Sequence, residues 1–79
     1  MTYIILFYKP FEKKSQICIM RDGEKERMRV DNDFRTIMIE IRKIARKTGI
    51  NTVQVVSPYS IIEELERYNN KSKITIIEI

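Results

Sequence analysis

The segment that most constrains the fold is residues 49–69, GINTVQVVSPYSIIEELERYN. Gly49 is suited to end a helix, and residues 51–56 form a short apolar strand pattern. Ser57 is a good N-cap, and Pro58 fits the first helical position, where a missing N–H costs nothing. A strand followed at once by a helix is typical of the crossover between parallel strands. The segment therefore predicts a sheet that packs against helices.

Three further strands are predicted before this segment, and one after it. Residues 2–8 are β-branched and aromatic without polar alternation, which is typical of a central strand covered on both faces. Residues 16–20 and 25–30 predict two antiparallel strands, and the Asp22-Gly23 pair between them predicts a hairpin turn. In residues 25–30 the basic side chains alternate with apolar ones, as expected for an edge strand with a basic outer row. Residues 73–79 predict the last strand.

A long helix is predicted over residues 34–48, after three candidate N-caps at residues 31–33 and before Gly49. Apolar residues recur on one of its faces with a spacing of three or four, and basic residues occupy the opposite face. Ile39 is surrounded by cations, so it indicates either a stray exposed isoleucine or part of an interface. A second helix, ending near residues 69–70, has an apolar stripe made by Ile61, Ile62, Leu65 and Tyr68.

The predicted element order is βββαβαβ, in one α/β (mixed α+β) domain over residues 1–79. Right-handed crossovers then give a five-stranded mixed sheet of order 3-2-1-4-5, with both helices on one face. A chain of 79 residues is near the size at which a single core is only just sufficient, so a partner subunit is a reasonable expectation.

Composition excludes several classes of chemistry. The chain has no histidine and one cysteine, Cys18, so neither a zinc site nor an intramolecular disulfide is expected, and we predict no cofactor. Cys18 lies in an apolar strand pattern and is expected in the core, with an intermolecular disulfide as the alternative. No membrane-spanning run or signal peptide is visible, which predicts a cytoplasmic, intracellular protein.

The element order and the run from Gly49 to Ile62 together resemble the ribonuclease H-like fold. Sequences of that family typically show a carboxylate-bearing helix ending in glycine, an apolar strand, then Ser-Asp-Ser and an apolar pair. The resemblance implies carboxylates that hold two magnesium ions at three positions, which here are Lys9, Phe34 and Pro58. None of these side chains can ligate a metal, so we expect a non-catalytic domain. A relocated site using Glu12, Asp31 or Asp33 is the alternative.

In larger relatives of that fold a C-terminal helix typically covers the second face of the sheet. Since the sequence ends at Ile79, we expect this face to be open, although the first strand is apolar on both sides. An exposed apolar face predicts a homodimer or a tight protein partner, with a wetter, tolerated face as the alternative. The predicted interface residues are Tyr3, Ile5, Phe7, Ile39, Val56 and Ile77.

The chain carries a net charge of +4 and a pI near 9.4, which favours polyanionic partners. We therefore predict a non-catalytic module that binds DNA, RNA or a nucleoprotein, with Tyr8, Phe11 and Tyr59 available to stack on bases. The alternatives are a homodimeric adaptor or inhibitor and, least favoured, a divergent metal-dependent nuclease. The predicted phosphate-binding residues are Lys9, Lys13, Lys14, Lys25, Arg27, Arg29, Arg35, Arg42, Lys43, Arg46 and Lys47.

Overall fold

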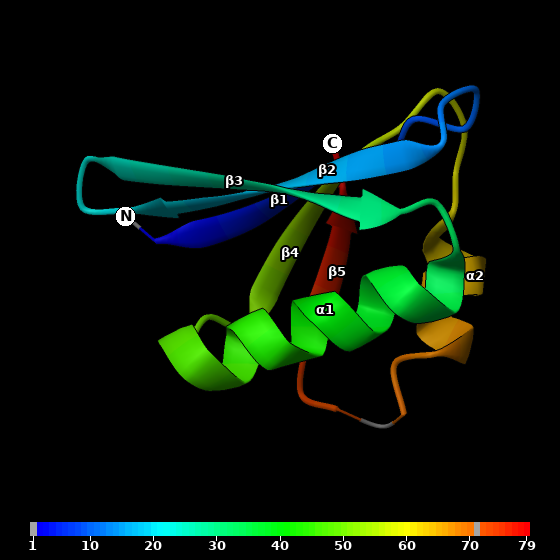
Figure 1. Ribbon diagram of the computed structural model, residues 1–79. Helices are drawn as coiled ribbons and strands as arrows, with labels where there is room; N and C mark the ends of the chain where they lie inside the picture. The colour runs from blue at the N-terminus through cyan, green and yellow to red at the C-terminus, as the bar shows by residue number, and fades with distance from the viewer. Residues whose placement is uncertain (1, 71) are drawn as a thin grey trace.

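The computed structural model describes residues 2–70 and 72–79, and its five strands form one mixed sheet in the order β3-β2-β1-β4-β5 (Figure 1). This order confirms the predicted one. The sheet and its two helices form a mixed α+β fold. The elements are β1 Tyr3–Phe7, β2 Lys14–Arg21, β3 Glu24–Asp31, α1 Phe34–Thr48, β4 Thr52–Val56, α2 Ile62–Arg67 and β5 Thr75–Glu78.

The antiparallel half of the sheet is a β2–β3 hairpin that extends the pairing of β1 with β2. Asp22 and Gly23 form its turn with φ of 40° and 85°, and two consecutive positive φ values give the twist that a tight hairpin needs. In the other half, β1 pairs with β4 and β4 with β5 in parallel. The two helices are the connections that parallel pairing requires.

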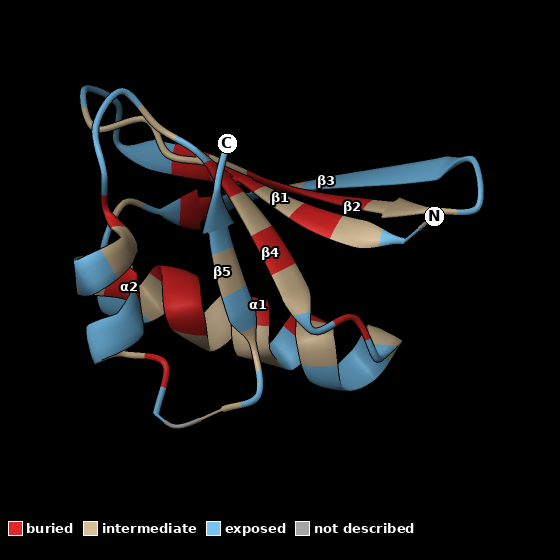
Figure 2. Cartoon of the chain, turned by 180° about the vertical axis from the view of Figure 1, so that it is seen from behind, coloured by how far each residue is buried: buried red, intermediate tan, exposed pale blue. Residues whose placement is uncertain are grey.

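One face of the sheet and both helices share a single apolar core (Figures 1 and 2). Ile4 and Leu6 of β1 are fully buried in this core, together with Ile37 of α1 and Leu65 of α2. The alternate residues of β1 point to the other face and are only half-buried. The apolar pattern of β1 is typical of cover on both faces, but no helix in the described part of the chain lies over this second face, in line with the expectation of an open face. We call it the open sheet face.

Helix α1 begins and ends as its sequence predicts. The Asp33 carboxylate accepts hydrogen bonds from the Thr36 amide at 3.0 Å and the Thr36 hydroxyl at 2.8 Å. At the other end Gly49 has φ of 78° and donates its N–H to the Ala45 carbonyl at 2.8 Å. Ile39 is half-buried, so the expectation of an exposed isoleucine is corrected.

Helix α2 begins later than predicted, at Ile62, with Ile61 in the N-cap position. Pro58 lies outside the helix, and the Ser57 hydroxyl donates to the Tyr59 carbonyl instead of capping a helix. The apolar stripe of α2 was predicted more accurately than the first residue of the helix. Ile61 and Leu65 of this stripe are fully buried. The helix ends at Arg67, before the predicted end, and β5 is shorter at both ends than residues 73–79.

Candidate nucleic-acid interface

The register of the antiparallel strands places the basic row of β3 on the open sheet face. Lys25, Arg27 and Arg29 are exposed, and they alternate with residues that point toward the helices. Arg29 lies opposite Gln16 of β2, and Gln16 in turn lies opposite Phe7 of β1. The cations of the edge strand and the aromatic ring of the central strand are therefore two strands apart on one face.

A shallow hollow of about 250 Å³ joins these side chains. Its lining combines one aromatic ring, three cations and two side chains of β2, and no acidic residue in the described chain lines it. The residues that line it are Phe7, Lys9, Gln16, Cys18, Lys25 and Arg27. A neighbouring hollow of about 130 Å³ shares Lys9 and Gln16, and its lining adds Arg29 and Lys14 together with the acidic Glu12. We call Phe7, Lys9, Gln16, Lys25, Arg27 and Arg29 the basic sheet face.

Most cations of the basic sheet face have no acidic partner within the described residues. Lys25, Arg27 and Arg29 form no ion pair there. Lys9 approaches Glu12 at 3.9 Å, but water reaches both side chains and the distance is long, so this pair is weak. Lys14, at the rim, is paired with Asp31 at 3.0 Å. A polyanion would therefore meet positive charge that internal pairs do not neutralise.

A buried polar network positions Lys9 at the rim of the hollow. Ser15 is 1% exposed, and its hydroxyl accepts the Lys9 N–H at 3.0 Å and donates to the Asn32 side-chain oxygen at 2.6 Å. The Asn32 amide then donates to the Lys9 carbonyl at 2.7 Å and to the Glu12 carbonyl at 3.1 Å. The loop after β1 is thus tied to the β3–α1 junction. This network was not predicted, because Ser15 and Asn32 are far apart in sequence.

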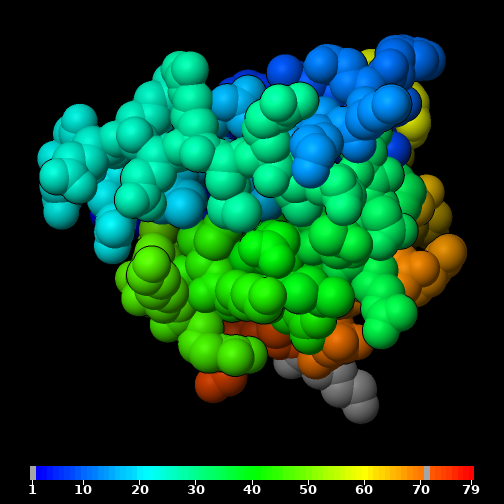
Figure 3. Space-filling model, viewed as in Figure 1, coloured from blue at the N-terminus to red at the C-terminus, as the bar shows by residue number. Residues whose placement is uncertain are grey.

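The remaining predicted phosphate-binding residues lie elsewhere. Lys13 is exposed in the loop after β1. The cations of α1 lie in the helix layer, on the opposite side from the open sheet face, and α1 forms much of the surface seen in Figure 3. Lys43 is paired with Glu40 of its own helix at 3.4 Å. The predicted basic residues therefore divide into two surfaces, and the α1 group is Arg35, Arg42, Lys43, Arg46 and Lys47.

Aromatic rings gather beside the positions where the resemblance implies metal-binding carboxylates. Phe34 stacks on Tyr8 with centroids 5.2 Å apart, and Tyr59 meets Tyr8 edge-on at 6.2 Å. Burial, and next the contact with Tyr59, raise the pKa of Tyr8. The Tyr8 ring is thus engaged within the protein, whereas Phe11 is 93% exposed. In the described residues, no group of three or more His, Cys, Asp or Glu side chains is arranged to hold a metal ion.

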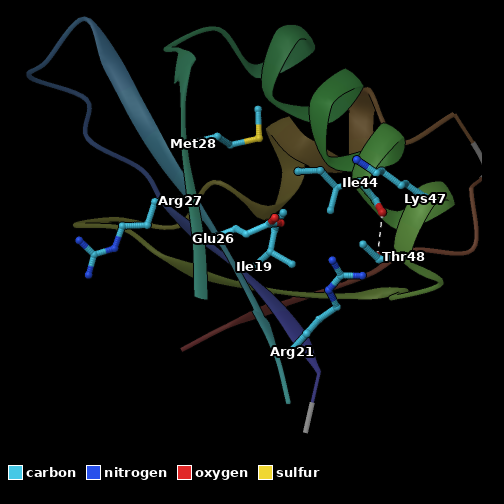
Figure 4. Close-up of a pocket in the computed structure, with 8 residues that line it drawn as sticks. All are labelled: Ile19, Arg21, Glu26, Arg27, Met28, Ile44, Lys47 and Thr48. Carbon is cyan, nitrogen blue, oxygen red and sulfur yellow. Dashed lines mark hydrogen bonds between the residues drawn. The ribbon is translucent and has the colours of Figure 1, made fainter. Parts of the chain in front are cut away.

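A larger hollow, of about 520 Å³, lies between the β2–β3 hairpin and the end of α1 (Figure 4). Ile19, Met28 and Ile44 give it an apolar lining, and its charged lining residues include the acidic Glu26 and the cations Arg21 and Lys47. The Arg27 side chain points away from the other labelled residues in Figure 4. Because its lining mixes both signs of charge, this hollow is less suited to a phosphate chain than the basic sheet face.

Five of the six predicted interface residues lie on the open sheet face, and Ile39 does not. Tyr3, Ile5 and Phe7 are half-buried on the open sheet face, whereas Ile39 belongs to α1 in the helix layer. Val56 is 38% exposed and Ile77 is 45% exposed, on the side of the sheet away from β3. Cys18 is buried as predicted, but it lies on the open sheet face between Ile5 and Arg27 and not in the core shared with the helices. The open sheet face is therefore basic toward β3 and apolar toward β5.

Comparisons with known proteins give no match among protein families, curated proteins or solved structures. The resemblance to the ribonuclease H-like fold therefore stays a prediction. No helix in the described part of the chain is both long enough and apolar enough to cross a membrane.

Proposed function

We propose that this chain is a non-catalytic nucleic-acid-binding module of ribonuclease H-like topology, which contacts phosphates through its basic sheet face. The observation that carries the proposal is the hollow that Lys9, Lys25 and Arg27 line together with Phe7, without an acidic residue in its described lining. Phosphate contacts by Lys and Arg supply most of the affinity of non-specific nucleic-acid binding. Aromatic rings beside such cations add stacking with bases.

The residues at the implied metal positions support the non-catalytic part of the proposal. Two-metal hydrolysis requires oxygen ligands that hold both ions beside the scissile phosphate. Lys9, Phe34 and Pro58 supply no such ligand. We expect no cleavage of DNA or RNA in magnesium or manganese. Metal-dependent cleavage that survives repurification would favour the divergent nuclease instead.

The proposed binding is tested by fluorescence anisotropy with labelled DNA and RNA oligonucleotides at about 50 and about 200 mM salt. We expect affinity to fall steeply with salt, because binding releases counterions from the phosphates. The double variant Arg27→Gln, Arg29→Gln should weaken binding and flatten the salt dependence. The matched control, Arg35→Gln, Arg46→Gln on α1, should bind like the unmodified chain. Absence of binding at low salt would contradict the proposal.

A homodimeric protein-interaction module is the second candidate, favoured by the apolar side of the open sheet face. Val56, Ile77 and Ile79 are exposed there, and β5 is an edge strand. Exposed apolar patches beside an unpaired strand edge are common at protein interfaces. Light scattering should then give a dimer that Ile77→Lys dissociates. A monomer at micromolar concentration would contradict this second candidate.

A further inference from the structure

We infer that the basic sheet face takes a single-stranded nucleic acid, with its phosphates along Lys25, Arg27 and Arg29 and its bases on Phe7 and Tyr3. The inference rests on the proposed function and specifies its ligand. Single-stranded DNA and RNA share the required chemistry, which is a flexible phosphate chain carrying unpaired bases.

The spacing of the sheet fits a backbone on the edge and bases toward the centre. The three cations are alternate residues of one strand, so they repeat about every 7 Å along the edge of the open sheet face. Phe7 and Tyr3 belong to β1, two strands or about 10 Å away. An extended nucleotide chain that follows β3 can therefore place its bases over β2 and β1.

The surface between the cations and the rings suits the flat faces and polar edges of bases. Cys18 is 3% exposed, so it adds little height to the floor of the hollow. The Gln16 amide is half-buried beside Phe7 and carries both donor and acceptor groups. Stacking on a ring with hydrogen bonds to a neighbouring amide is how unpaired bases are bound on open sheets.

A duplex fits the same surface less well. Its base faces are covered by neighbouring base pairs, so Phe7 and Tyr3 would have nothing to stack on. Its major groove admits a helix or a two-stranded ribbon, whereas the basic sheet face is a broad surface spread over three strands. Only the phosphates would remain for contact, and the aromatic part of the face would stay unused.

A second copy of this chain is also a poorer occupant of this part of the sheet. It would bury Lys9, Lys25, Arg27 and Arg29, and the same face offers them little acidic complement. Asp31, at the end of the row, is already paired with Lys14. Burying unpaired charges costs more than the apolar contacts around them return. A polyanion supplies the missing negative charge.

The test compares a labelled oligo(dT) and oligo(U) with a duplex of equal length, using anisotropy on the intact chain. We expect tighter binding to both single strands than to the duplex. Phe7→Leu should lower single-strand affinity about tenfold while leaving the slope against salt unchanged, because it removes stacking but no charge. Phe7→Tyr keeps a ring and should bind like the unmodified chain. Arg27→Gln should reduce the salt slope by about one.

The outcomes separate this inference from the proposed function. Equal or tighter duplex binding, with Phe7→Leu without effect, would overturn the inference while the proposed nucleic-acid binding stands. No binding to any of the three probes at low salt would overturn both. If Phe7→Leu instead dissociates a dimer and leaves nucleic-acid binding unchanged, the face is an interface between copies and the inference is wrong. Circular dichroism of each variant verifies that it is folded.

Discussion

The ring of Phe34, at the start of α1, stacks on the ring of Tyr8, which follows β1, with 5.2 Å between centroids and 30° between planes. Both rings pack against the main core while remaining partly exposed. The contact joins the end of the central strand to the first turn of the long helix. An apolar contact thus lies where the resemblance implies a carboxylate and a metal ion.

We expect Phe34→Ala to destabilise the protein by about 2 kcal/mol, below the ~3–5 typical of a fully buried phenylalanine, because the ring is half-exposed. Urea unfolding followed by circular dichroism measures this change. Tyr59→Ala is the matched control. Tyr59 is 53% exposed, so a smaller loss is expected. Equal losses for both variants would show that the Tyr8–Phe34 stack is not the stabilising contact.

The Asp33 cap should make stability depend on acidic pH. Hydrogen bonds from the Thr36 hydroxyl and then the Thr36 amide lower the pKa of Asp33. A lowered pKa means that its contribution is present above the unfolded-state pKa and lost as pH falls through the folded-state value. Asp33→Asn keeps a capping oxygen but does not titrate, so it should flatten this part of the stability profile. Thermal unfolding from neutral to acidic pH tests this, and an unchanged profile would contradict it.

Removing the hydroxyl of Ser15 should be costly. Ser15→Ala leaves the Lys9 N–H and the Asn32 oxygen without their partner in a part-buried network, which is expected to cost about 1–3 kcal/mol. Ser60→Ala removes an exposed hydroxyl and should change stability by less than about 0.5 kcal/mol. Chemical unfolding compares the two variants. Equal losses of unfolding free energy in Ser15→Ala and Ser60→Ala would contradict a stabilising role for this network.

Alkaline pH should weaken the fold through Tyr8. Its pKa is raised, chiefly by burial, so its neutral form is favoured in the folded state. Its contribution is full below the unfolded-state pKa of about 10 and declines as pH rises toward the folded-state value. Tyr8→Phe cannot ionise, so it should lose less stability than the unmodified chain between neutral and alkaline pH. Identical losses in the two proteins would contradict this prediction.

The sequence predicted the strands and their order well, because its apolar alternation and its turn residues agree. It predicted the start of α2 wrongly for a physical reason. Ser57 and Pro58 satisfy local helix-start preferences, but Ile61 is fully buried and the helix begins after it. The Ser57 hydroxyl donates to the Tyr59 carbonyl, so it is not available to cap a helix. The apolar pattern of β1 is typical of a strand covered on both faces, yet its second face is open, since such a pattern does not specify what lies over each face.

The candidate site was only partly predictable. The basic row of β3 was visible as alternation, and Phe7 was visible as an apolar residue of the open face. The basic row and Phe7 come together on one face because of the register between β2 and β3, which pairs Arg27 with Cys18 and Arg29 with Gln16. Gln16 was missed as a site residue, although it pairs with Phe7 across the strands and therefore lies on the same face of the sheet. The α1 cations were grouped with the site only by charge.

The central claim is that the basic sheet face binds nucleic acid, and mapping the binding surface by NMR tests it most directly. Isotope-labelled protein is titrated with oligo(dT), and the shifts of each backbone amide and of the Gln16 side-chain amide are followed. We predict shifts concentrated at Phe7, Lys9, Gln16, Arg27 and Arg29, with little change along α1. Shifts confined to the outer face of α1, or none at low salt, would contradict the account.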